Sequence, residues 1–196
     1  MARKYELQQR ADAMEETRLR ITEAAMELHG SVGPARTTVT AVAERAGVQR
    51  HTVYRHFPTE AELFASCTAH FAALHPWPDT DAWSRIDDPR ERLATALDEL
   101  YRWYEETSEM WTRILRDREL VEAIEPNLQP FYDYVGHCVA TLSAGWGLRG
   151  RRKRVLEASI RHALEFATWQ SLVRRGDIAR SEAVNLMTAL ATASAS

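Results

Sequence analysis

The sequence has few of the features that mark membrane, secreted or disulfide-bonded proteins. Its 196 residues contain only two cysteines, Cys67 and Cys138, and these do not form a paired motif. No apolar run approaches the roughly 18 residues of a membrane-spanning helix, and the N-terminus lacks an apolar signal segment. We therefore expect a cytoplasmic protein in which both cysteines are small buried side chains rather than a disulfide.

Motifs of the common enzyme classes are also missing. The chain contains no Gly-x-Ser-x-Gly, no Cys-x-x-Cys, no His-Glu-x-x-His and no glycine-rich phosphate loop. His51 and His56, like His70 and His75, are five residues apart, which places them on different faces of a helix and disfavours shared metal binding. We expect no catalytic residues, no metal and no cofactor, and an all-helical small-molecule enzyme remains the least favoured alternative.

A strand pattern of useful length is absent, and apolar residues instead recur at helical spacing along the chain. Hydrophobic residues make up 45% of the sequence, enough for a substantial core. The pattern predicts an all-α fold of about nine helices. Among them are helices from about Asp12 to Leu28, from Thr59 to Leu74, from Asp88 onward, a short one around Trp111, and a final pair from Arg152 to Arg175 and Ser181 to Ala193.

The most informative segment is TTVTAVAERAGVQRHTVYRHF, residues 37–57. Val39, Val42, Ala43 and Ala46 are spaced as one apolar stripe of a short helix, with small alanines where a second helix must cross closely. Gly47 follows, where a left-handed backbone can end the helix and begin a sharp turn. This spacing predicts a helix-turn-helix. A solvated helical hairpin is the alternative, but it leaves the cationic and aromatic groups of the second helix unexplained.

The charge is distributed in a way that supports contact with DNA. The net charge is −3, yet the segment from Arg36 to Phe57 contains four arginines and a single acidic residue, Glu44. Positive charge is thus concentrated where phosphates would lie, and acids are spread over the rest of the chain.

Residues 17–64 resemble the N-terminal domain of the TetR family of transcriptional regulators. The resemblance rests on the blocks ITEAAMELHG, TTVTAVAERAGV and TVYRHFPTEAELF. It implies a homodimeric repressor that binds a palindromic DNA operator and is released by a small-molecule effector. It also implies two domains, a helix-turn-helix DNA-binding domain at residues 12–58 and a ligand-binding and dimerisation domain at residues 59–196.

By position, the resemblance assigns DNA contacts to both helices of the motif. Thr38 would cap the first helix and touch phosphate, and Arg50 is the best candidate for reading a guanine because a guanidinium can bind O6 and N7 together. Glu60 departs from the family pattern, which commonly has a lysine there. The predicted DNA-binding residues are Arg36, Thr38, Gln49, Arg50, His51, Thr52, Tyr54, Arg55 and His56, of which Tyr54 and His56 would mainly hold the backbone.

Aromatic and polarisable residues are concentrated in the middle of the chain, over four expected helices, and could surround one apolar cavity between helices. Plain core packing is the alternative for each of them. An aromatic cavity favours an apolar or aromatic effector, while a constitutive DNA-binding protein without an effector remains a second possible function. The predicted ligand-binding residues are Trp103, Tyr104, Trp111, Phe131, Tyr134, His137, His162, Phe166 and Trp169.

Dimerisation is expected to fall to the final pair of helices, each of which has an apolar stripe. One stripe comprises Val155, Ser159, His162, Phe166, Trp169 and Val173, and the other comprises Val184, Met187, Leu190 and Ala191.

Overall fold

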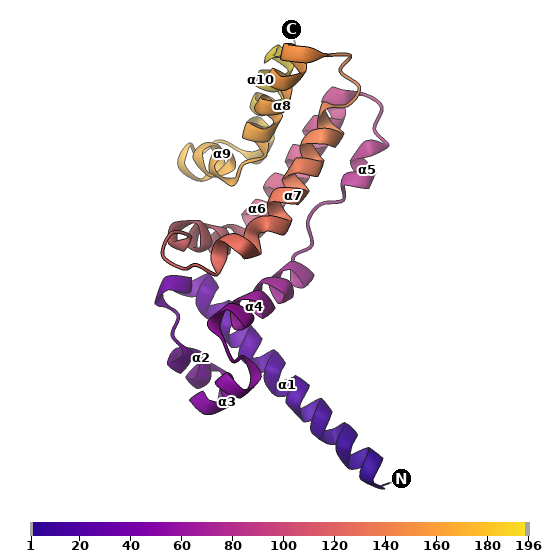
Figure 1. Ribbon diagram of the computed structural model, residues 1–196. Coiled ribbons are helices and arrows are strands. Elements are labelled where there is room, and N and C mark those ends of the chain that lie inside the picture. Colours follow the sequence, from indigo (N-terminus) through magenta and orange to yellow (C-terminus); the bar gives the residue numbers. More distant parts are fainter. Residues whose placement is uncertain (1, 195–196) are drawn as a thin grey trace. The chain divides into compact units, whose positions relative to one another are not determined.

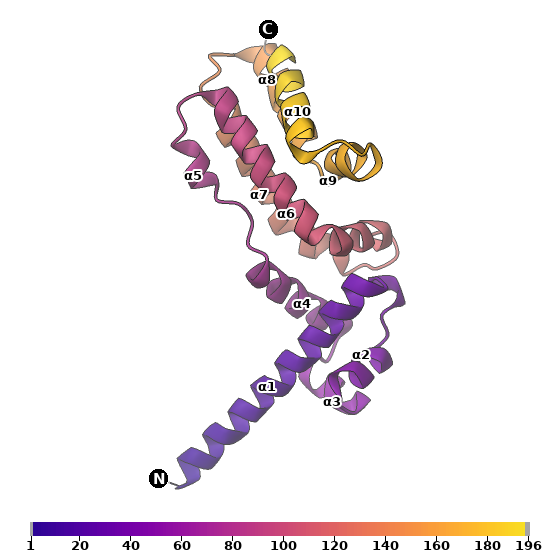
Figure 2. The ribbon, with the colours of Figure 1, turned by 180° about the vertical axis from the view of Figure 1, so that it is seen from behind.

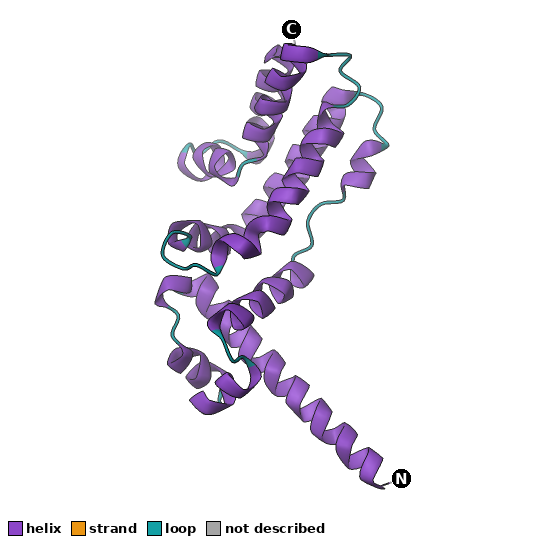
Figure 3. Cartoon of the chain, in the orientation of Figure 1, coloured by secondary structure: helices purple, strands orange, loops and turns teal. Residues whose placement is uncertain are grey.

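The computed structural model describes residues 2–194, with side chains from residue 5 onward, and every regular element in this range is helical (Figure 3). The all-α prediction is confirmed, with ten α-helices in the described range rather than about nine. The helices are α1 (Ala2–Ser31), α2 (Val39–Ala46), α3 (Arg50–His56), α4 (Glu60–Leu74), α5 (Thr80–Ser84), α6 (Pro89–Asp117), α7 (Ile124–Ser143), α8 (Gly150–Leu164), α9 (Phe166–Trp169) and α10 (Arg180–Ser194) (Figure 1).

The chain forms two compact units. The first contains the residues up to His75 together with 109–127, and the second contains 76–108 and 128–196. These units do not coincide with the two domains expected from sequence, which meet at residue 58. In the structure α4 packs on α1 inside the first unit, and the end of α6 belongs to that unit too. None of the described helices combines the length and the apolarity needed to cross a membrane.

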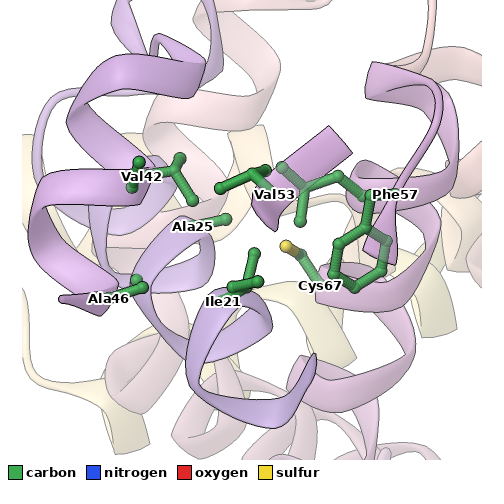
Figure 4. Close-up of a cluster of buried hydrophobic side chains, with 10 residues drawn as sticks. Ile21, Ala25, Val42, Ala46, Val53, Phe57 and Cys67 are labelled. Carbon is green, nitrogen blue, oxygen red and sulfur yellow. The ribbon is translucent and has the colours of Figure 1, made fainter. Parts of the chain in front are cut away.

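The first unit is built on a core shared by α1, α2, α3 and α4. Ile21, Val42, Val53, Phe57 and Cys67 are each no more than 3% exposed, and their side chains point toward one another in Figure 4. Burying a side chain of the size of valine or phenylalanine stabilises a fold by roughly 1.5–3 kcal/mol. The apolar stripe that predicted the helix-turn-helix is therefore the surface that fixes α2 and α3 on α1.

The predicted cap at Thr38 and turn at Gly47 are confirmed, and Thr59 caps α4 in the same way. The Thr38 hydroxyl accepts a hydrogen bond from the Ala41 amide at 3.1 Å, and the Thr59 hydroxyl accepts one from the Glu62 amide at 3.2 Å. These bonds satisfy amides that have no partner within the helix. Gly47 ends α2 with a left-handed φ of 65°. The turn between α2 and α3 thus forms as its sequence predicts.

Two predicted helix limits in the first half of the chain are wrong. The first helix begins at Ala2 instead of Asp12. The segment before Asp12 is rich in good helix formers, and the helix continues through it without interruption. The short helix expected around Trp111 is part of α6, which continues unbroken from Pro89 to Asp117. The start of α6 is as predicted, with the Asp88 carboxylate accepting a hydrogen bond from the Arg90 amide at 2.8 Å.

The helix predicted from Arg152 to Arg175 is also wrong, because the chain is extended at Glu165, where ψ is 138°. The break leaves the last carbonyls of α8 without helical hydrogen-bond partners, and two buried tyrosines donate to them. The Tyr101 hydroxyl donates to the Ala163 carbonyl at 2.9 Å, and the Tyr104 hydroxyl donates to the Leu164 carbonyl at 2.7 Å. Burial raises the pKa of both hydroxyls, so they remain donors. These partners lie about 60 positions away, beyond the reach of a local pattern.

In the second unit, α6 and α7 run alongside each other and α8 packs on α10 (Figures 1 and 2). A buried arginine, Arg92, ends α7 by donating to the carbonyls of Thr141 and Ala144, both at 3.1 Å. The same side chain donates to Ile86 and Asp87 carbonyls at 2.9 and 3.3 Å. One guanidinium therefore joins the end of α7 to the loop that precedes α6.

Both cysteines are buried and free, as predicted. Burial raises the pKa of the Cys67 thiol and of the Cys138 thiol to about 12. Each thiol is therefore protonated at neutral pH and behaves as a small apolar group.

Candidate DNA-binding surface

The polar side of α3 is open to solvent. Gln49, Arg50, His51, Tyr54 and Arg55 are exposed, whereas Val53, on the opposite side of the helix, is 1% exposed. Thr52 is half-buried. A short helix held by one buried side and presenting cationic, amide and phenol groups on the other can enter a major groove.

The C-terminal end of α3 is held by a residue that the sequence did not reveal. Arg18 of α1 donates to the His56 carbonyl at 2.8 Å, and its guanidinium carbon lies 4.1 Å from the centre of the Phe57 ring. A cation is favourable at the negative end of a helix and over an aromatic face. Arg18 therefore orients α3, although no local motif links two residues that are 38 positions apart.

His56 is less available than the sequence prediction assumed. It is half-buried, and its Nε2 atom is shielded from solvent without a hydrogen-bond partner among the described residues. Burial lowers the pKa of His56, and the neighbouring charges of Arg55 and Arg18 lower it further. A neutral, shielded imidazole is a poor phosphate ligand, so His56 contributes to packing more than the other predicted residues do.

Not every arginine of the motif is free to contact phosphate. Arg45 forms an ion pair with Glu27 of α1, with its Nε 2.6 Å from the carboxylate. By contrast, Arg36, Arg50 and Arg55 are exposed and form no ion pair within the described part of the chain. Among the arginines of the motif, these three are therefore the ones free to contact phosphate.

The turn that leads into α2 is fixed by the end of α6, in an arrangement we call the Arg116–Asp117 clamp. Arg116 donates to the Val32 carbonyl at 2.9 Å and to the Asp117 carboxylate at 2.7 Å. The buried Asp117 carboxylate accepts a hydrogen bond from the Ala35 amide at 3.0 Å. The Arg116 hydrogen bond holds the pKa of Asp117 below its usual value. The clamp, which no sequence motif signals, sets the start of the helix-turn-helix.

In the second unit, six of the predicted ligand-binding residues form one aromatic cluster. Ring centres are 5.2 Å apart for Tyr104 and Phe166, 6.0 Å for Trp103 and Phe131, and 5.2 Å for Phe166 and Trp169. The members of the aromatic cluster are Trp103, Tyr104, Phe131, Tyr134, Phe166 and Trp169.

Three predicted ligand-binding residues are not in the aromatic cluster. His137 on α7 and His162 on α8 are exposed, and Trp111 belongs to the first unit. Trp77, which the sequence analysis missed, stacks on Tyr134 with ring centres 5.0 Å apart. The sequence signal for Trp77 was its position between two prolines, which is more typical of an exposed loop than of an aromatic cluster.

Comparison with known proteins agrees with this arrangement. Residues 21–67 match the family described as bacterial regulatory proteins, tetR family. An HTH-type transcriptional repressor of Mycobacterium tuberculosis is 31% identical to this chain, over 68% of this chain and 73% of that protein. This chain belongs to the TetR family. Its members are DNA-binding transcriptional regulators and not enzymes, so the helix-turn-helix of α2 and α3 is a DNA-binding element.

Other TetR-family proteins match in part or in fold. The HTH-type transcriptional regulator TtgR of Pseudomonas putida is 49% identical over 25% of this chain and 23% of its own length. A crystal structure described as a TetR-family regulator of Mesorhizobium loti superposes with a TM-score of 0.66, covering 92% of this chain and 96% of that one. Its sequence identity is 16%, so it supports the fold alone.

Proposed function

We propose that this TetR-family protein is a homodimeric repressor that binds a palindromic operator through α3 of each protomer and is released by a small apolar or aromatic effector. The exposed polar face of α3, held on a buried core and accompanied by three arginines without ion pairs, carries the proposal. The operator contacts are assigned to residues 12–58, through Arg36, Thr38, Gln49, Arg50, His51, Thr52, Tyr54 and Arg55, with His56 in a lesser role.

Replacing Arg50 by alanine tests the reading of bases. We expect the substitution to weaken operator binding by about 1–3 kcal/mol and to relax the preference at one base position, because a bidentate contact to guanine is lost. Selection of bound duplexes from a random library, followed by sequencing, measures both effects. An unchanged base preference would remove Arg50 from this role. Tyr54→Phe is the matched control. It should weaken binding to all duplexes alike, because it removes a contact to the DNA backbone.

The effector is assigned to the aromatic cluster. Its rings offer apolar area, and the buried Trp169 Nε1 has no hydrogen-bond partner among the described residues. A buried donor without a partner costs about 1–3 kcal/mol, and an acceptor on a ligand would recover this. The cluster therefore favours a flat aromatic molecule that carries a carbonyl or similar acceptor.

A matched pair of probes tests this assignment. 2-Acetonaphthone and 2-isopropylnaphthalene have similar shapes, but only the ketone can accept a hydrogen bond from Trp169. We expect the ketone to bind up to about tenfold more tightly, which is the range of one net hydrogen bond. Trp169→Phe should abolish the difference while leaving operator binding intact, and calorimetric titration measures both. A preference for the ketone that survives the substitution would place the effector elsewhere.

Dimerisation is assigned to the outer faces of α8 and α10, but only Val155 and Leu190 of the stripes predicted from sequence are large apolar side chains exposed there. Val184, Met187 and Ala191 are buried within the protomer, as are Phe166 and Trp169 of the other stripe. Large apolar side chains do remain exposed on the two helices, at Val155, Leu186 and Leu190. Leu186 and Leu190 are one turn apart on the same face of α10, as a helix that packs on a second copy requires.

A further inference from the structure

The first unit contains a cavity that shares only Thr38, at its edge with the DNA-binding surface, with the functions above. It has a volume of about 460 Å³ and lies among the end of α1, the start of α2, the first turn of α4 and the loop at residues 120–123. Its volume is within the usual range for small-molecule sites. It shares no lining residue with the aromatic cluster, and all its walls belong to the unit that contains the helix-turn-helix.

A buried polar side chain without a hydrogen-bond partner lines this cavity. His29 is only 8% exposed, and its imidazole forms no hydrogen bond within the described part of the chain. Its ring packs against Phe64 with centres 5.2 Å apart. Burial lowers the pKa of His29 to about 4 in spite of the nearby Asp117 carboxylate. At neutral pH the imidazole therefore has one nitrogen that can accept a hydrogen bond.

The charged residues that line the cavity are both acidic. Glu60 on α4 and Glu122 on the opposite loop both line it, and neither forms an ion pair with any described residue. No lysine or arginine is among the lining residues. Two carboxylates without counterions and a neutral imidazole favour a cationic group and disfavour an anion.

The remaining walls are apolar. Val42, Leu63 and Phe64 come from α2 and α4, and Leu120 and Val121 come from the loop. Such walls reward a compact aliphatic or aromatic body, while polar groups at a few points fix its orientation. The hydroxyls of Thr37 and Thr38 add further polar groups at the start of α2.

We propose that this cavity, the amine site, is a second small-molecule site that binds a protonated organic amine with a compact apolar or aromatic body. The ammonium group donates to the Glu60 and Glu122 carboxylates and to the His29 imidazole, and the body packs on Phe64 and Leu63. The site explains why an acid stands at position 60, next to the DNA-binding surface. It is independent of the effector assigned to the aromatic cluster.

The amine site is tested on the full-length protein with three probes of one shape: 2-phenylethylamine, 2-phenylethanol and 3-phenylpropanoate. Calorimetric titration measures their affinities, and the NMR signals of the His29 imidazole report binding at the site. We expect the amine to bind with a dissociation constant of about 1 mM or tighter. We also expect it to bind about fivefold more tightly than the alcohol, with the carboxylate weakest.

Substitutions of the two acids identify the site. Glu60→Gln and Glu122→Gln should each weaken the amine about twofold, and the double variant should bind the amine and the alcohol about equally. Glu62→Gln on the same turn of α4, and Glu119→Gln near the loop, are matched controls because neither residue lines the cavity. All four positions are exposed, so the variants should fold normally.

Several results would overturn the amine site. Equal binding of amine and alcohol to the natural protein would remove the role of the two acids. Equal losses in Glu62→Gln and Glu60→Gln would show only a diffuse effect of charge. An amine that leaves the His29 signals unchanged but alters the signals of Trp169 would be bound in the aromatic cluster instead. None of these results bears on the operator or on the ketone preference of the cluster.

Discussion

Replacing Arg92 by alanine is expected to lower the free energy of unfolding by about 4 kcal/mol. Arg92 is 8% exposed and donates to four backbone carbonyls, two at the end of α7 and two in the loop before α6. Alanine leaves these four acceptors without the guanidinium donor, and an unpaired buried group costs about 1–3 kcal/mol. Water recovers part of this cost at Asp87 and Ala144, which are exposed.

Urea unfolding measures the effect of Arg92→Ala. Arg90→Ala is the matched control, because Arg90 is exposed on the same turn of α6 and should change stability by no more than about 0.5 kcal/mol. Arg92→Lys should recover only part of the loss, since an ammonium cannot span the positions that a planar guanidinium reaches. A loss below about 1 kcal/mol in Arg92→Ala would contradict the proposed role of these hydrogen bonds.

Replacing Gly33 by alanine is expected to cost about 3 kcal/mol and to weaken operator binding as well. Gly33 has φ 98° and ψ 156°, a conformation that only glycine adopts readily. An added Cβ atom would also overlap Arg116 Nη2 and Asp117 Oδ2. The substitution therefore strains the backbone and separates the Arg116–Asp117 clamp from the turn that sets the start of α2.

Gly47→Ala separates the two contributions. Gly47 also has a positive φ, 65°, but no atom lies within 4 Å of the added Cβ position. Gly47→Ala should therefore lower the free energy of unfolding only through backbone strain, by roughly 1–2 kcal/mol. Urea unfolding compares the two variants, and operator titration shows whether the clamp matters for binding. Equal stability losses at both glycines would mean that the clamp adds nothing.

The helix-turn-helix could be predicted because its determinants are local. The apolar spacing from Val39 to Ala46, the cap at Thr38 and the turn at Gly47 are all read within one short segment, and the structure places them as expected. The exposed face of α3 follows from the same periodicity, since the burial of Val53 leaves Arg50 and Tyr54 on the other side.

The remaining features depend on contacts between distant residues. Nothing near Glu165 signals a break, because the tyrosines that bind the freed carbonyls are on α6. The role of Arg18 depends on the approach of α1 to the end of α3, and the clamp joins residues more than 80 positions apart. The aromatic residues could be recognised as a group, but their composition alone did not distinguish exposed His137 from buried Trp169.

The most direct test of the central claim is a titration of the purified protein with two labelled duplexes over a series of salt concentrations. One duplex is the sequence selected from a random library, and the other has the same bases in scrambled order. A repressor that reads bases with α3 should prefer the selected duplex by about a thousandfold or more, with two protomers bound to each duplex. Its affinity should also fall steeply with salt, as phosphate contacts require. Equal affinity for both duplexes at every salt concentration would contradict the account and leave a protein that binds DNA without regard to sequence.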